Sequence, residues 1–330
     1  MKQIDFLAIG DIVVDAFIRL KDASVHCNIK KEDCELCMPF GEKIPFEFAE
    51  VVTAVGNGPN AAVSAARLGL NSASMCDIGN DLNGSDCVAS LKKNGVSTKF
   101  VSKHKNKKTN YHYVLWYEDE RTILVKHEDF GYKFSAPRKN PRWVYITSLG
   151  AESLPYQLEI ANWLQKNPDI KVAFQPGTFQ MNVGFEKLLA FYKRSEVFFC
   201  NVEEAKRILK SESSDTKELM KGIHSLGPKN VVITDGPKGA YAFDGNRNWF
   251  MPPYPDPKPP YERTGAGDAF ASTFTVALAL GKPISEALMW GPINSMSVVQ
   301  NIGAQKGLLS REKLEEFLKN APEGYSAKEI

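Results

Sequence analysis

Short apolar segments that alternate with helical segments restrict the fold of this chain more than any other sequence feature. Strands and helices are expected in strict alternation, closing with a hairpin strand, over residues 144–147, 156–165, 172–174, 185–192, 197–200, 202–209, 231–234 and 240–243. Such alternation is typical of a parallel sheet, because each helix carries the chain back to begin the next strand. The sequence therefore predicts an α/β fold with a doubly wound, mostly parallel sheet and helices on both faces.

Two stretches in the N-terminal part do not follow this alternation. Residues 17–55 and 99–130 contain short extended segments without a helical period, and we expect them to form a small separate β-sheet. The remaining segments, 1–16, 56–98 and 131–330, are expected to form the α/β core.

The charge of the chain is nearly balanced, with 41 Lys and Arg against 39 Asp and Glu. This balance argues against a nucleic-acid partner. No apolar run is long enough to span a bilayer, and the N-terminus carries Asp5 too early for a signal peptide. We therefore expect a cytoplasmic protein without a membrane partner.

Three of the six cysteines, Cys27, Cys34 and Cys37, cluster next to His26. A disulfide framework is not expected in a cytosolic chain of this size. A C-x-x-C pair with a further Cys and a His could bind zinc, but a second half-site with the usual spacing is absent. The sequence favours reduced thiols, with a zinc site as the alternative.

A glycine-rich turn, Gly265-Ala266-Gly267, opens an apolar helix near the C-terminus. Its small residues let several backbone N–H groups face one point, with the positive end of the helix dipole behind them. Asp268 follows in the first helical turn, where a carboxylate stays ionised. An anion site beside a carboxylate indicates transfer of a phosphoryl group to a hydroxyl group. The alternative is a core turn with an ordinary N-terminal carboxylate.

Other polar residues follow predicted strands. Asp11 and Asp15 come after the strand 4–10, at the end where open α/β sheets bind ligands, although they could also be solvated loop residues. A second glycine-rich turn, 56–60, opens a helix with Asn60 as its candidate N-cap. Its amide side chains suit recognition of a polyol, and a capped core helix is the alternative.

Two further candidate sites lie later in the chain. Asn201 and Glu204 lie one helical turn apart after the strand 197–200. The carboxylate could orient Mg²⁺ or its waters near nucleotide phosphates, and the alternative is a helix cap with a solvent-facing Glu204. The turn 234–239 could admit a flat or charged ligand against bare backbone.

In this order, these motifs resemble those of the PfkB (ribokinase-like) carbohydrate kinases over essentially the full chain. The turn at 265–268 is similar to the family's C-terminal signature, and the turn at 56–60 looks like its N-terminal glycine signature. The segment 78–84, the 201/204 pair and the turn at 234–236 fall in the family's order. The resemblance implies a ribokinase-like fold and ATP-dependent transfer of the γ-phosphoryl group to a hydroxymethyl group of a sugar, with Mg²⁺ on the phosphates.

The resemblance also implies a role for each site residue. Asp268 would be the general base, and the amides of Gly265, Ala266 and Gly267 would form the anion hole. ATP would be bound by Asn201, Glu204, Thr234, Gly236 and Gly239, with Glu204 placing Mg²⁺ through water. The acceptor would be bound by Asp15, Gly56, Asn57 and Asn60, with Asp11 as a further candidate.

The two extended stretches would form a β lid that keeps water from ATP, and relatives often dimerise through this lid. The chain departs from the family at three places. Val55 stands where the family often has the first glycine of a pair, Val13 stands where sugar-specific members often carry Asn, and Glu262-Arg263 replaces the more usual Asp-Thr. Several relatives bind a monovalent cation near the third place, so we expect Arg263 to replace that cation or to reach a substrate phosphate.

Two other functions remain open. A nucleoside kinase is possible because aromatic residues in the expected lid, Tyr111, Tyr113, Trp116 and Tyr117, could stack on a base. A non-catalytic regulator that binds a sugar or nucleotide is the second alternative, although an intact Asp268 weighs against it.

Overall fold

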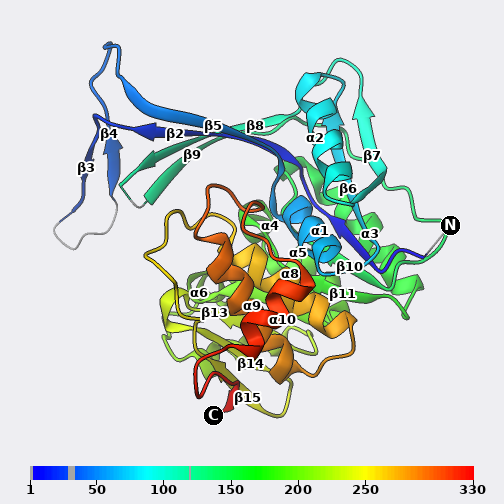
Figure 1. Cartoon of the computed structure of the whole chain (residues 1–330). Helices are drawn as coiled ribbons and strands as arrows, with labels where there is room; N and C mark the ends of the chain where they lie inside the picture. Colours follow the sequence, from blue (N-terminus) through cyan, green and yellow to red (C-terminus); the bar gives the residue numbers. More distant parts are fainter. Residues whose placement is uncertain (1–2, 29–33, 119) are drawn as a thin grey trace.

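The structure is a computed structural model that describes residues 3–28, 34–118 and 120–330. A large sheet, flanked by helices, carries a smaller sheet that projects from one edge (Figure 1). Within the described residues the large sheet has ten strands, in the order β16-β15-β14-β13-β12-β11-β10-β1-β6-β7. They are β1 (Phe6–Ile9), β6 (Ser72–Gly79), β7 (Ser97–His104), β10 (Trp143–Ile146), β11 (Lys171–Phe174), β12 (Val197–Asn201), β13 (Val231–Thr234), β14 (Ala240–Phe243), β15 (Asn248–Met251) and β16 (Lys328–Glu329).

The strands from β13 to β7 run parallel, and β14, β15 and β16 add an antiparallel edge. Successive residues of β1 supply both hydrophobic layers: Phe6 and Ala8 face one, and Leu7 and Ile9 face the other. Strands buried on both faces must be apolar throughout, which explains the short continuous apolar runs in the sequence. The prediction of a doubly wound, mostly parallel sheet is confirmed.

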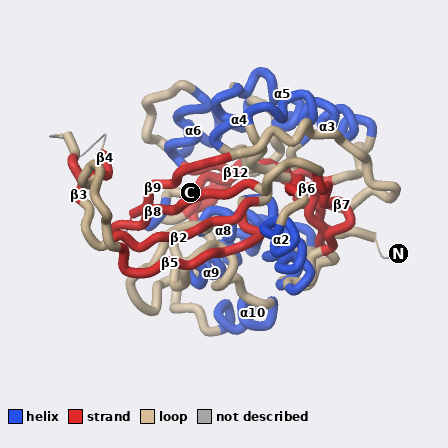
Figure 2. The backbone as a smooth tube through the Cα atoms, turned by 90° about the horizontal axis from the view of Figure 1, so that it is seen from above, coloured by secondary structure: helices blue, strands red, loops and turns tan. Residues whose placement is uncertain are grey.

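Helices cover both faces of this sheet (Figure 2). One layer contains α1 (Asn57–Arg67), α2 (Leu82–Lys93), α8 (Ala266–Ala279), α9 (Ile284–Val298) and α10 (Arg311–Lys319). The other contains α3 (Leu154–Lys166), α4 (Thr178–Val183), α5 (Phe185–Arg194), α6 (Val202–Leu209) and α7 (Thr216–Ser225). Over the part of the chain that the structure describes, none of the helices is long and apolar enough to cross a membrane.

The smaller sheet, which we call the lid, has four strands in the order β5-β2-β8-β9. They are β2 (Val13–Leu20), β5 (Phe46–Val55), β8 (Asn110–Tyr117) and β9 (Glu120–Lys126). One strand from the stretch expected to form the lid lies elsewhere: β7 pairs in parallel with β6 at the edge of the large sheet. Phe100 and Val101 of β7 pack against opposite hydrophobic layers, so this strand is part of the core.

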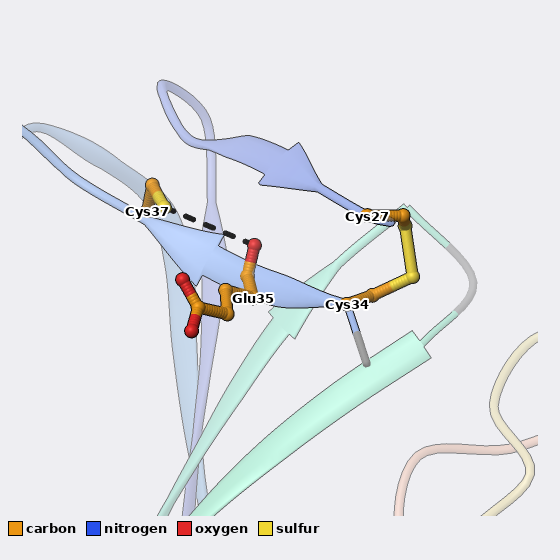
Figure 3. The surroundings of a disulfide bond; sticks show 4 residues. All are labelled: Cys27, Cys34, Glu35 and Cys37. Carbon is orange, nitrogen blue, oxygen red and sulfur yellow. Dashed lines mark hydrogen bonds between the residues drawn. A yellow bond between two sulfur atoms is a disulfide. The ribbon is translucent and has the colours of Figure 1, made fainter. Parts of the chain in front are cut away.

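A short hairpin of β3 (Ser24–His26) and β4 (Glu35–Cys37) extends beyond the lid, and its tip corrects the prediction for the cysteines. Cys27 and Cys34 form a disulfide with a Cα–Cα distance of 4.0 Å, and Cys37 lies apart from it (Figure 3). The expectation of reduced thiols is wrong for this pair. The zinc alternative is wrong as well, since the disulfide takes up two of the thiols that would bind the metal. His26 at the end of β3 pairs with Glu35 at the start of β4, so the residues just beyond the strands, Cys27 and Cys34, lie side by side.

Candidate active site

The carboxyl ends of the central strands lie side by side, as the sequence predicts. β1, β10 and β11 lie in register, with Ile9 opposite Ile146 and Ile146 opposite Phe174. The residues that follow these strands therefore share one edge of the sheet. The next two strands end at the same edge with Asn201 opposite Thr234.

The amino end of α8 faces this edge. Gly265 caps the helix in the left-handed region, at φ 81°, and no side chain caps the first-turn amides. A Cβ on Gly265 would lie 2.2 Å from Cβ of Ala304, so only glycine fits. Ala266 N–H donates to the carbonyl oxygen of Arg263 in a long hydrogen bond of 3.4 Å. The amides of the first turn lack partners within the helix and can therefore bind an anion.

Asp268 lies in this first turn and is held by amide side chains from two other elements. Asn60 Nδ2 donates to its Oδ2 at 2.9 Å, and Gln175 Nε2 donates to its Oδ1 at 3.4 Å. Burial raises the pKa of Asp268 to about 6; hydrogen bonds from Asn60, Gln175 and Asn57 oppose the rise, and the charge of Glu204 adds to it. At neutral pH the carboxylate is ionised and can accept a proton.

Asn60 does not cap its helix, contrary to the prediction. Gly56 occupies the N-cap position with a φ of 107°, and a Cβ there would lie 2.5 Å from the carbonyl oxygen of Asp11. Asn60 lies one turn further on and is 4% exposed. Gln305 Nε2 donates to Asn60 Oδ1 at 3.0 Å and so orients the Asn60 amide toward Asp268.

Sequence reasoning missed two residues of this network. Gln175 accepts a hydrogen bond from Tyr145 through its Oε1, which turns its Nε2 toward Asp268. Its position directly after β11 is a signal that could have identified it. Gln305 lies in a loop between α9 and α10, and nothing in its local sequence indicates its role.

A cavity of about 570 Å³ lies beside the α8 amino end. Thr234, Gly236 and Gly239 line it, together with Ala266 and Gly267 of the glycine turn. Its apolar wall, which sequence reasoning missed, comes from α8, α9 and the proline-rich segment 252–260 between β15 and α8. It includes Phe270, Pro292, Met296, Val299, Pro253 and Pro255. Three predicted nucleotide-binding residues and two residues of the predicted anion hole therefore share one cavity, whereas Asn201, Glu204 and Gly265 are not among its lining residues.

Arg263 also lines this cavity, and its positive charge lowers the pKa of Asp256, against the larger effect of burial, which raises it.

A wider groove of about 1020 Å³ lies at the opposite edge of the large sheet, next to Arg142, Lys171 and Glu196 at the amino ends of the strands. None of the predicted site residues lines that groove.

Asn201 and Glu204 form a reciprocal cap at the start of α6. Glu204 N–H donates to Asn201 Oδ1 at 2.8 Å, and Asn201 N–H donates to Glu204 Oε2 at 2.9 Å. The capping alternative is thus present in the structure. Burial raises the pKa of Glu204, and the Asn201 N–H and the positive charge of Arg207 oppose the rise. The carboxylate is half-buried and close enough to Asp268 to raise that residue's pKa, and such a group fits a divalent cation.

On the lid side, Asp11 and Asp15 are both buried. Asp15 Oδ1 lies 3.2 Å from His112 Nδ1, since β2 and β8 place the two residues opposite each other. Asp11 Oδ2 lies 3.3 Å from His127 Nδ1. Neither histidine was assigned a role from the sequence, because their distance from the aspartates along the chain conceals the pairing.

Residues 23–311 match the family described as pfkB family carbohydrate kinase. The ribokinase of Bacillus subtilis is 27% identical over 270 residues, which cover 80% of this chain and 87% of that protein. The cytidine kinase of Thermococcus kodakarensis is 34% identical over 148 residues, which cover 44% of this chain and 52% of that protein. The solved structure of Arabidopsis thaliana ribokinase complexed with ribose and ATP has the same fold, with a TM-score of 0.80 at 20% identity, covering 97% of this chain and 99% of that one.

Proposed function

Since this chain belongs to the pfkB family of carbohydrate kinases, we propose that it transfers the γ-phosphoryl group of ATP to a hydroxymethyl group of a sugar. The observation that carries the proposal is the position of Asp268. Its carboxylate lies in the first turn of α8, among amides that also line the 570 Å³ cavity. A base and an anion site thus share one helix end, as phosphoryl transfer to an alcohol requires.

Asp268 removes the proton from the acceptor hydroxyl as that oxygen bonds to the γ-phosphorus, while the bond from this phosphorus to the β–γ bridging oxygen of ATP breaks and ADP leaves. With a pKa of about 6 it is ionised at neutral pH and still basic enough to accept a proton. The amides of Gly265, Ala266 and Gly267 stabilise the negative charge on the transferring group. Asn60 and Gln175 keep the carboxylate in position through their hydrogen bonds.

ATP binds in the 570 Å³ cavity, with Thr234, Gly236 and Gly239 against the nucleotide. Arg263, at the same cavity, reaches toward the phosphates. Asn201 and Glu204 lie beside the phosphates, and Glu204 would hold Mg²⁺ through water. Bound there, Mg²⁺ would neutralise phosphate charge.

The acceptor lies between Asp268 and the lid, where Asp11, Asp15, Gly56, Asn57 and Asn60 surround it. A sugar fits the lid better than a nucleoside does. Trp116 is 3% exposed and packs against Phe48 and Tyr261, so it offers no free face to a base. Tyr111 and Tyr113 lie on the face of the lid opposite Asp15 and His112. The similarity to a cytidine kinase keeps a nucleoside as the second candidate acceptor.

The lid also supports a proposal about assembly. Val51, Tyr113 and Leu124 lie on its outer face and are 56%, 48% and 52% exposed. An exposed apolar sheet face fits a second copy of the chain, so we propose a homodimer through the lids. An enzyme that consumes ATP in this way would act in the cytoplasm.

The test is a coupled assay of ADP release with ATP and Mg²⁺ over pentoses, hexoses, sugar phosphates, sugar acids and nucleosides. Acceptor-dependent ADP release with a sugar supports the proposal. Release with nucleosides alone would favour the nucleoside kinase. If none of the acceptors causes ADP release, the kinase function is contradicted, and a regulator that binds a sugar or nucleotide is favoured.

A further inference from the structure

A cavity of about 560 Å³ lies at the edge of the large sheet, where β6 and β7 pair (Figure 1). Its walls come from β6, β7, α3 and residues 133–139, which belong to the connection between β9 and β10. We propose that this cavity, which we call the edge cavity, binds a small phosphate ester whose phosphate is attached to a flat, apolar group. The proposal concerns a second ligand site and does not depend on the proposed kinase function.

Four cationic side chains line the edge cavity, and all four belong to exposed residues: Lys99, Lys133, Arg138 and Lys139. None of them forms an ion pair with a described residue, and Lys99 Nζ lies over the ring of Phe100 at 5.1 Å from its centroid. Cations that gather around a cavity without counter-charges produce a positive potential there, which attracts an anion. The guanidinium of Arg138 can bind two phosphate oxygens at once, and the lysines add point charges.

The cations of the wider 1020 Å³ groove differ in this respect. Arg142 pairs with Asp5 at 3.2 Å, and Lys171 pairs with Glu196 at 2.9 Å. The charges of these two cations are already compensated, so an anion would have to displace a carboxylate to bind them. This difference favours the edge cavity as the anion site.

Asp77 is the one carboxylate among the described residues that line the edge cavity, and it has a partner of its own. His104 Nε2 lies 2.6 Å from Asp77 Oδ1, and Asp77 is 7% exposed. Burial raises the pKa of Asp77, and the hydrogen bond and the charge of His104 oppose the rise. The four cations therefore outweigh this carboxylate, and the charge around the cavity is positive.

Apolar side chains form the floor of the edge cavity. Ile4, Met75 and Tyr156 are 7%, 7% and 4% exposed, and Phe100 packs against the same hydrophobic layer. A flat apolar group can pack on such side chains, whereas a sugar would bury hydroxyl groups there without partners. Ligand cavities commonly have volumes of about 300–1,000 Å³, so this one has room for a phosphate and a ring.

The edge cavity is separate from the 570 Å³ cavity beside α8. The two share none of their described lining residues. Five strand pairings lie between β6 and β13, and they correspond to about 24 Å. The edge cavity also lies on the sheet face that α3 covers, whereas α8 covers the opposite face. One small molecule therefore cannot occupy both cavities.

The experiment uses phenyl phosphate as the probe, with inorganic phosphate and phenol as its two separate halves. In calorimetry on the full chain, phenyl phosphate should bind about tenfold or more tightly than either half, because it uses both the cations and the apolar floor. Lys133→Gln/Arg138→Gln should raise its dissociation constant about tenfold or more, since charge-assisted hydrogen bonds are lost. Lys103→Gln/Lys105→Gln removes two exposed charges outside the cavity and is the matched control. It should change the constant by less than about twofold.

Ser135→Trp is a second test, because it keeps all four cations and fills the cavity with a large side chain. Ser135 is exposed, so the variant should fold, and it should bind phenyl phosphate about tenfold more weakly. A dissociation constant that both cavity variants leave unchanged would place the probe elsewhere and overturn the proposal. The proposal would also be overturned if wild type did not bind the probe, if the control variant weakened binding as much as the cavity variants, or if inorganic phosphate bound as tightly as phenyl phosphate.

Discussion

Arg121 Nε, at the start of lid strand β9, lies 3.8 Å from Oε1 of Glu262, just before the glycine turn that opens α8. The side chain of Glu262 is 3% exposed, and Oε1 also accepts a hydrogen bond from Thr264 N–H at 2.7 Å. Its Oε2 has no hydrogen-bond partner in the described structure. The ion-pair partner of this carboxylate therefore comes from the lid and not from Arg263, which is exposed and lines the 570 Å³ cavity.

We expect Arg121→Gln to lower kcat/KM about tenfold, because removing one partner of a largely buried ion pair leaves the other charge uncompensated. If the Arg121 guanidinium replaces a monovalent cation, K⁺ should stimulate the variant. The rate of the wild type should then be the same in Na⁺, K⁺ or a bulky amine. Steady-state rates in the three buffers measure this. Lys126→Gln, an exposed charge on the same strand, is the control. A strong K⁺ requirement in wild type would rule out the replacement.

Asp268→Asn should reduce turnover by about 10²–10⁴-fold, the usual contribution of a positioned general base. Binding of ATP and of the acceptor should stay within a few-fold of wild type, because the shape of the side chain is preserved. Single-turnover rates and calorimetry separate the two effects. Turnover close to that of wild type would show that Asp268 is not the base.

The same substitution should change stability with a defined sign. The pKa of Asp268 rises from 3.8 to about 6 on folding, so the folded state binds the proton more tightly. The stability that this proton uptake contributes is present at low pH and is lost as the pH rises through 6. The melting temperature of Asp268→Asn, relative to wild type, should therefore be higher at pH 7 than at pH 4. A difference that does not vary with pH would contradict the raised pKa.

The raised pKa also predicts the pH dependence of activity. The acid limb of kcat/KM should have its midpoint near pH 6, with activity lost below it as Asp268 is protonated. Asn60→Ala removes a hydrogen bond that stabilises the ionised form, so the limb should move to higher pH. Gln300→Ala, whose amide donates to the carbonyl of Lys258, is the control and should leave the limb in place. If the midpoint of the acid limb does not change in Asn60→Ala, the hydrogen bond from Asn60 does not affect the pKa of the base.

The cysteines provide a chemical test of the structure. Without reductant, Cys37 should be the thiol that reacts quickly with a disulfide reagent, because Cys76, Cys87 and Cys200 are buried. Burial raises the pKa of Cys87 to about 12 and also raises the pKa of the other two thiols, which slows their reaction further. Reduction should expose two additional reactive thiols, and these should be absent in a Cys27→Ser/Cys34→Ser variant. Three fast thiols before reduction would contradict the disulfide.

The local features of the sequence were sufficient to predict which strand ends and turns carry several of the candidate site residues. Strand ends, glycine turns and the residues just after them follow from patterns a few residues long. Ala266 and Gly267 line the same cavity as Thr234 and Gly236, and Gly265 directly precedes them, because the parallel strands end on the side of the sheet where α8 begins. The same local reasoning misplaced Asn60 as a cap, since a cap and a buried hydrogen-bond donor look alike in sequence.

By itself, the sequence determined the α/β class, the mostly parallel sheet with helices on both faces and the position of the glycine turn that opens α8, because periodicity and glycine spacing are short-range signals. Only the tertiary structure decided which distant residues meet. Gln305 orients Asn60 across 245 positions, and His112 joins Asp15 through strand pairing. The assignment of β7 to the large sheet also depends on strand pairing, here with β6. Such contacts depend on how whole elements pack, and no local pattern records that packing.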